Sequence, residues 1–124
     1  MERALRDLAC HDKELSILFT DDDRITQLNN RYLKRRAPTN VLAFPMTGWL
    51  TSKAESSMLG DVVISVDTAL REAGECGEPF DYVIDRLMIH GLLHLLGYDH
   101  EKSTAGAEGM KKEEKRLVAL IRED

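Results

Sequence analysis

Three histidines with the spacing of metal ligands lie within eleven residues, in the run HGLLHLLGYDH. His90 and His94 are four residues apart, so on a helix their rings project from the same face, one turn apart. Gly97 breaks that helix, and the turn after it can return His100 to the same point. Two imidazoles on a helix and one after a turn give three protein ligands and leave a fourth position open, as in catalytic zinc sites. We therefore predict that His90, His94 and His100 bind one zinc ion or another divalent transition metal.

Packing alone explains this pattern poorly. A lone histidine on an apolar helix is usually a hydrogen-bonded core residue, but burying three imidazoles costs desolvation free energy unless partners satisfy them. The residue after the first histidine is Gly91, whereas a zincin-type protease has its general-base glutamate there. The sequence therefore argues against that class of protease. Asp99, next to His100, is either a carboxylate that orients a ligand ring or a turn-forming aspartate.

A short basic segment stands out from an otherwise acidic chain. The chain has 17 Lys and Arg residues against 22 Asp and Glu residues, which gives a net charge of −5. Four of the cations lie close together with no acidic residue between them: Arg31, Lys34, Arg35 and Arg36. Guanidinium groups bind phosphate bidentately. The segment is therefore either a phosphate contact or the solvated end of a helix.

Length and composition indicate one globular domain. The chain has 124 residues, of which 43% are hydrophobic. No stretch approaches the roughly 20 apolar residues of a membrane-spanning helix, and the first ten residues lack an apolar signal-peptide core. We therefore expect a cytoplasmic protein with no membrane partner. Cys10 and Cys76 lack the close spacing of a thiolate metal site and are predicted to be reduced thiols.

Helices and strands interleave along the chain, which indicates a layered α/β or α+β domain. Short apolar runs predict strands at 15–19, 41–44 and 62–64. Helical patterns predict helices at 2–9, 21–33, 67–74, 80–96 and 103–122. The segment 46–58 is expected to be a long loop. Helix 80–96 is apolar on nearly every side, which predicts a buried central helix that carries the first two histidines.

Several segments resemble the YbeY family of bacterial metal-dependent endoribonucleases. Besides the histidine run, PTNVLAFP at 38–45 is similar to the family's PT(D/N)VLSFP, with Ala43 for the more usual serine. LGDVVIS at 59–65 is similar to the family's LGDIVIS, and Leu28-Asn29 matches its LN pair. The segments occur in the family's order and extend over about residues 14 to 121.

This resemblance implies a single α+β domain over 1–124, with helices packed on a mixed sheet of three to four strands. It implies a zinc-type ion on His90, His94 and His100. It also implies cleavage of single-stranded RNA, maturation of the 3′ end of small-subunit ribosomal RNA, and a part in ribosome quality control. Ribosomal RNA and the small ribosomal subunit are then the expected partners.

The chain departs from the family pattern in two places. Family members usually begin with a strand before the first helix, and this chain begins almost at the helix, which implies a sheet with one strand fewer or a shortened chain. Many members have an arginine directly after the aromatic residue of the second helix, where this chain has Leu33. One of the four cations of the basic segment is then expected to bind phosphate in its place.

Two other functions remain open on the sequence. One is a metallohydrolase of another substrate class, such as peptides, and the other is a ribosome-associated factor whose metal is mainly structural. No residue is identified as a general base. The nucleophile is either a water molecule or the 2′-hydroxyl of the RNA itself.

Overall fold

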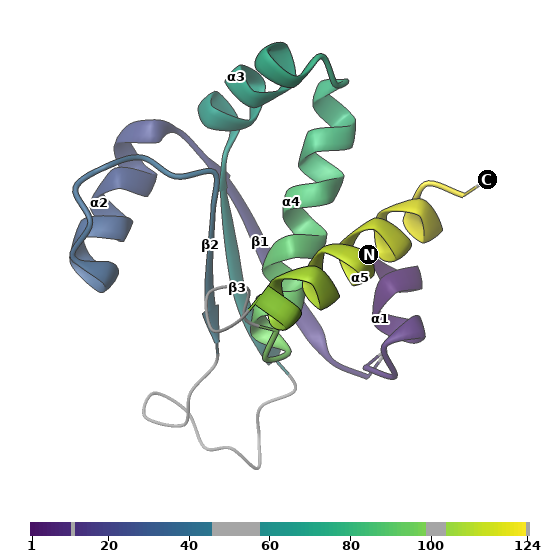
Figure 1. Cartoon of the computed structure of the whole chain (residues 1–124). Coiled ribbons are helices and arrows are strands. Elements are labelled where there is room, and N and C mark those ends of the chain that lie inside the picture. The colour runs from purple at the N-terminus through teal and green to yellow at the C-terminus, as the bar shows by residue number, and fades with distance from the viewer. Residues whose placement is uncertain (11, 46–57, 99–103, 124) are drawn as a thin grey trace.

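The computed structural model describes residues 1–10, 12–45, 58–98 and 104–123, which form five helices and three strands (Figure 1). In chain order these elements are α1 (Glu2–Asp7), β1 (Glu14–Thr20), α2 (Asp22–Leu33), β2 (Val41–Pro45), β3 (Met58–Ser65), α3 (Val66–Cys76), α4 (Phe80–Leu95) and α5 (Thr104–Ile121). All five predicted helices and all three predicted strands are therefore confirmed.

The three strands form one mixed sheet in the order β1-β3-β2. The central strand β3 pairs in parallel with β1, where Ile17 lies opposite Val62, and antiparallel with β2, where Ala43 lies opposite the same residue. The prediction of an α+β fold with a small mixed sheet is confirmed. The loop expected at 46–58 lies outside the described residues, except that Met58 begins β3.

The beginning of β3 was missed because it contains Gly60 and Asp61, two residue types that are rare in strands. Gly60 has φ of 149°, and a Cβ atom at this position would collide with the main-chain oxygen of Phe44. A glycine is therefore required for β2 to pair closely with β3 here.

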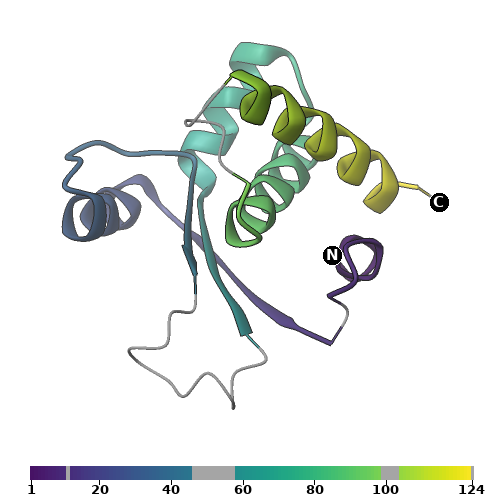
Figure 2. The ribbon, with the colours of Figure 1, turned by 60° about the horizontal axis from the view of Figure 1, so that its bottom comes forward.

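Helices cover both faces of the sheet (Figure 2). Helices α3 and α4 pack on one face through a cluster that includes Val62, Ile64 and Leu87. Helix α2 packs on the other face, where Ile25 meets Leu42 and Val63. Helix α5 packs against α4, and α1 against α5. The layers therefore place α2 and α4 on opposite sides of the edge strand β2.

The predicted buried central helix is α4, which contacts β2, β3, α3 and α5. Its fully buried side chains are Val83, Leu87, Ile89, Leu92 and Leu93. Gly91 faces the sheet, and a Cβ atom there would lie 2.6 Å from a methyl carbon of Val62. The glycine between the two histidines therefore allows α4 to lie close against β3.

Helix α2 is fixed at both ends. At its start, the Asp21 carboxylate accepts a hydrogen bond from the main-chain N–H of Arg24 at 2.8 Å, as predicted for a helix cap. The next carboxylate, Asp22, accepts hydrogen bonds from the hydroxyls of Ser65 and Thr68, which lower its pKa to about 2. At the other end Lys34 adopts a left-handed conformation with φ of 59°, which turns the chain out of the helix.

None of the helices in the described parts of the chain is long and apolar enough to cross a membrane. Cys10 is buried and Cys76 is exposed, and both thiols are free, as the sequence predicts.

Candidate metal centre and cleft

The rings of His90 and His94 meet edge to face on α4, with an angle of 68° between their planes. Their Nε2 atoms are 3.2 Å apart, and the ring centroids are 4.7 Å apart. Two imidazoles bound to one zinc ion at 2.0–2.1 Å with a near-tetrahedral angle have ligand nitrogens about 3.3 Å apart. The 3.2 Å separation fits a hydrogen bond between the two rings, and it is also the separation that a shared metal ion requires.

His100 and Asp99 lie outside the described residues, so the convergence of three histidines and the orienting role of Asp99 remain predictions. Within the described ranges, no group of three or more His, Cys, Asp and Glu side chains forms a metal cluster. The pair on α4 is therefore the part of the predicted ligand set that the structure places together.

A carboxylate that the sequence analysis missed holds the first histidine. Glu114 on α5 lies with Oε2 at 2.8 Å from Nδ1 of His90, and both side chains are mostly buried. A carboxylate at Nδ1 places the ring proton there and leaves Nε2, the atom that faces His94, able to bind a metal ion. The signal in the sequence is an acidic residue on the inward face of α5, four positions after the buried Met110 and three before the buried Leu117.

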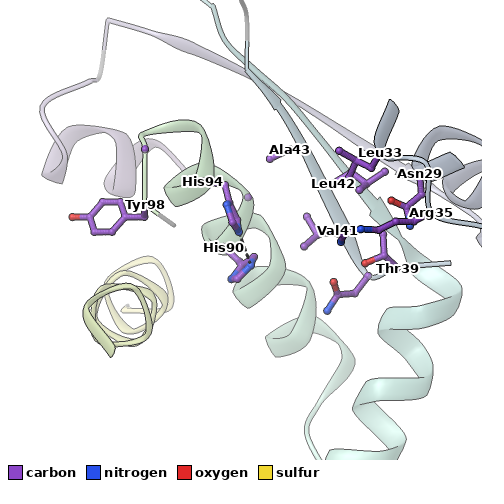
Figure 3. Close-up of a pocket in the computed structure, with 13 residues that line it drawn as sticks. Asn29, Leu33, Arg35, Thr39, Val41, Leu42, Ala43, His90, His94 and Tyr98 are labelled. Atoms are coloured by element: carbon purple, nitrogen blue, oxygen red, sulfur yellow. Dashed lines mark hydrogen bonds between the residues drawn. The ribbon is translucent and has the colours of Figure 1, made fainter. Parts of the chain in front are cut away.

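The histidine pair forms one wall of a cleft of about 780 Å³ along strand β2 (Figure 3). On the α4 side the cleft is lined by His90, Gly91, His94, Gly97 and Tyr98, on the α2 side by Asn29, Leu33 and Arg35, and between them by Thr39, Asn40, Val41, Leu42 and Ala43. The cleft therefore combines two imidazoles, one guanidinium group and the edge of a strand.

The four predicted cations are all exposed, and they occupy different positions. Arg35 lines the cleft, and in Figure 3 its side chain reaches from the turn after α2 toward α4. Arg31 instead stacks over the ring of Tyr32, 5.5 Å from the centroid. Lys34 and Arg36 are absent from the described lining of the cleft. Arg35 is therefore the cation of this segment that the structure brings to the histidines.

The turn that directs Arg35 is held by a buried asparagine. Asn29 is 3% exposed; its Nδ2 donates to the main-chain oxygen of Ala37 at 2.9 Å, and its own main-chain oxygen accepts from the N–H of Arg35 at 3.3 Å. Its Oδ1 atom is buried without a hydrogen-bond partner among the described residues. A buried acceptor without a partner costs about 1–3 kcal/mol, so stability alone does not explain an asparagine here.

The structure also shows why this chain has no room for the glutamate that is the general base of a zincin-type protease. The residue that would carry the glutamate of a zincin is Gly91, which packs against Val62 and has no room for a side chain. Any larger residue at this position would push α4 away from β3.

Comparison with known proteins supports the assignment suggested by the motifs. The sequence model of a family described as Endoribonuclease YbeY matches residues 1–122. A protein named Endoribonuclease YbeY from Syntrophotalea carbinolica is 47% identical over 99% of this chain and 83% of its own length. One of the same name from Aquifex aeolicus is 48% identical over 90% of this chain and 70% of its own.

A solved structure has the same fold. The solution structure of a Thermotoga maritima protein matches 97% of this chain and 75% of its own, with a TM-score of 0.68 and 25% sequence identity.

Proposed function

Because the chain belongs to the YbeY endoribonuclease family, we propose that it is a metal-dependent endoribonuclease whose metal ion is held by His90, His94 and His100. The observation that carries this proposal is the 3.2 Å separation of the Nε2 atoms of His90 and His94 in the wall of a cleft that also contains Arg35. We further propose zinc as the ion, since three histidine ligands suit it.

The substrate that fits this function is single-stranded ribosomal RNA. From the family resemblance we propose that the protein matures the 3′ end of small-subunit ribosomal RNA, acts in ribosome quality control in the cytoplasm, and meets its substrate on the small ribosomal subunit. We also propose that the basic segment, Arg31, Lys34, Arg35 and Arg36, contacts RNA phosphates, with Arg35 inside the cleft and the other three cations outside it.

The proposed cleavage reaction uses the bound metal ion and three side chains, each with its own role. His90, His94 and His100 would hold the divalent ion, which would supply a water of lowered pKa and would offset the negative charge on a phosphoryl oxygen. Glu114 holds the proton of His90 at Nδ1 and fixes the orientation of the ring. Arg35 binds a phosphate through its guanidinium group and so positions the strand beside the histidines. Asp99 is proposed to orient His100.

The experiment that tests this function combines metal analysis with cleavage of a single-stranded RNA. The purified wild-type protein should contain about one equivalent of zinc or another divalent metal, and it should cleave the RNA. His94→Ala should lose both the metal and the cleavage, and it should unfold at a lower temperature because metal binding stabilises the fold. His11→Ala, a change outside the motif, is the matched control and should retain all three properties.

The products of the same assay identify the nucleophile. A 2′,3′-cyclic phosphate end shows attack by the RNA's own 2′-hydroxyl, whereas a linear phosphate end from the first turnover shows attack by water. A His94→Ala protein with unchanged metal content, thermal midpoint and cleavage would contradict the proposed site.

A further inference from the structure

The strand that lines the cleft has main-chain groups that point away from the sheet. Strand β2 is at the edge of the sheet. The N–H of Ser65 donates to the main-chain oxygen of Asn40 at 3.0 Å, which makes these two residues a hydrogen-bonded pair. Hydrogen-bonded and non-hydrogen-bonded pairs alternate along an antiparallel ladder. In the observed register, the main-chain groups of Val41 and Ala43 therefore face outward from β3.

These outward groups face the cleft that contains the histidines. Val41 and Ala43 both line it, opposite His90 and His94 on α4 (Figure 3). Among the described residues, no hydrogen bond of a turn, loop or cap involves the N–H of Ala43, and in the strand register this N–H points away from β3. At the next outward position the residue is Pro45, which has no N–H to donate. The amide of Ala43 is therefore the last outward donor of β2.

We propose that the main-chain N–H of Ala43 donates a hydrogen bond to a non-bridging oxygen of the phosphodiester that is cleaved. The proposal rests on the RNA-cleaving function proposed above. The edges of sheets are sites where main-chain N–H groups bind anions. The pairing of Leu42 and Phe44 with β3 fixes the direction of the Ala43 amide before substrate binds. Such a preorganised donor stabilises the charge that develops in the transition state.

The side chain at this position supports a main-chain role. Alanine has no side-chain donor, so a hydrogen bond from this position to a phosphate comes from the main-chain N–H. The side chain of Ala43 lies on the same face of the strand as Val41, which packs against the cluster between the sheet and α3 and α4. The contact with phosphate is therefore assigned to the amide.

A proline substitution tests the donor directly. Ala43→Pro removes the N–H but no hydrogen bond of the β2–β3 ladder, because this amide points outward. Ala43→Gly is the matched control, since it keeps the amide and removes the methyl group. We expect Ala43→Pro to lower kcat for single-stranded RNA by about 10²- to 10³-fold relative to Ala43→Gly, as for loss of one oxyanion donor. KM and metal affinity should remain close to those of the control.

A second variant lacks the proline ring, so its result does not depend on how that ring affects folding. A second measurement detects the hydrogen bond without an activity assay. Replacing Ala43 by lactic acid exchanges the N–H for an ester oxygen without adding a ring, and it should reproduce the loss in kcat. In the wild-type protein, the amide proton signal of Ala43 should move downfield on titration with inorganic phosphate, while that of Leu42, which points toward β3, should move little.

Equal kcat values for the proline, lactic acid and glycine variants, in a wild-type background that cleaves RNA, would overturn this proposal and leave the proposed function intact. A wild-type protein that cleaves no RNA would instead refute the proposed function, and the phosphate titration would still test the donor. An Ala43 amide that responds to an extended peptide but not to phosphate would overturn the proposal in favour of strand pairing with a peptide.

Discussion

The hydrogen bond between Glu114 and His90 determines which nitrogen of that histidine can bind a metal ion. Glu114→Gln keeps the size of the side chain but removes the charge that favours a proton on Nδ1 of His90. We expect the affinity for zinc to fall by about 10- to 100-fold, as measured by competition with a chromophoric chelator. Glu113→Gln, whose carboxylate pairs with Arg116 on the exposed side of α5, is the control. Equal zinc affinities of the two variants would show that Glu114 does not orient the ring.

Asn29 is predicted to act through Arg35. Asn29→Leu keeps the branched shape of the side chain, removes the buried Oδ1 acceptor and breaks the bond to Ala37. We expect the free energy of unfolding to change by less than about 1 kcal/mol, because the lost hydrogen bond and the relieved desolvation offset each other. The affinity for single-stranded RNA should nevertheless fall to that of Arg35→Ala.

A double variant shows whether the two residues act together. If Asn29 acts by holding the turn, Asn29→Leu should cause no further loss of RNA affinity in the Arg35→Ala background, since coupled residues are not additive. Asn30→Ala, a change at the exposed neighbouring position, should leave RNA affinity unchanged. Additive losses in the double variant would mean that Asn29 affects RNA by another route.

At the scale of elements, the sequence predicts the helices and strands better than the contacts between them. Asp21 as a helix cap and the apolar surface of α4 are local signals, so the boundaries of α2 and α4 could be predicted. Glu114 was missed because its role depends on the packing of α5 against α4. Arg35 could not be separated from its neighbours, since the left-handed turn at Lys34 decides which cation enters the cleft.

The close packing of α4 against β3 makes Gly91 sensitive to any side chain. In Gly91→Ala the new methyl group would lie 2.6 Å from a methyl carbon of Val62, so α4 or β3 must move. We expect a loss of about 1–3 kcal/mol in the free energy of unfolding, the usual cost of overpacking a core. Zinc affinity should also fall, since α4 carries two of the proposed ligands.

Urea denaturation of the metal-free protein measures the effect of Gly91→Ala on stability, and chelator competition measures its effect on zinc. The control is Gly74→Ala in α3, where a Cβ atom meets no other atom within 4 Å. This change should be neutral or stabilising, because alanine favours a helix. A Gly91→Ala protein as stable as this control would show that the approach of α4 to β3 is looser than the structure indicates.

At the scale of the whole molecule, charge is distributed so that an acidic protein can approach a polyanion. The net charge is −5, and in the proposed function the basic segment at the end of α2 overcomes the repulsion from RNA locally. Figure 1 shows α2 and α1 on opposite sides of the molecule. Cations near α1 should therefore contribute little to RNA binding, which makes Arg6 and Lys13 suitable controls.

The salt dependence of RNA binding measures how many phosphates the basic segment neutralises. Each phosphate neutralised on a single strand contributes about 0.7 to the slope of log K against log salt concentration. Changing Arg31, Lys34, Arg35 and Arg36 to glutamine should therefore flatten the slope by up to about 3, and Arg35→Gln alone by about 0.7. The loss of affinity should be nearly the same for RNAs of different sequence, because phosphate contacts position a strand without reading its bases.

The control for this experiment is the double variant Arg6→Gln and Lys13→Gln, which also lowers the net charge but acts far from the cleft. Its slope should stay close to that of the wild type. Equal slopes for the quadruple variant and the wild type would show that the basic segment is only a solvated surface. A flattened slope in the quadruple variant with an unchanged slope in Arg35→Gln would place the phosphate contacts outside the cleft. The histidines would then cleave RNA that is held from the rim of the cleft rather than from within it.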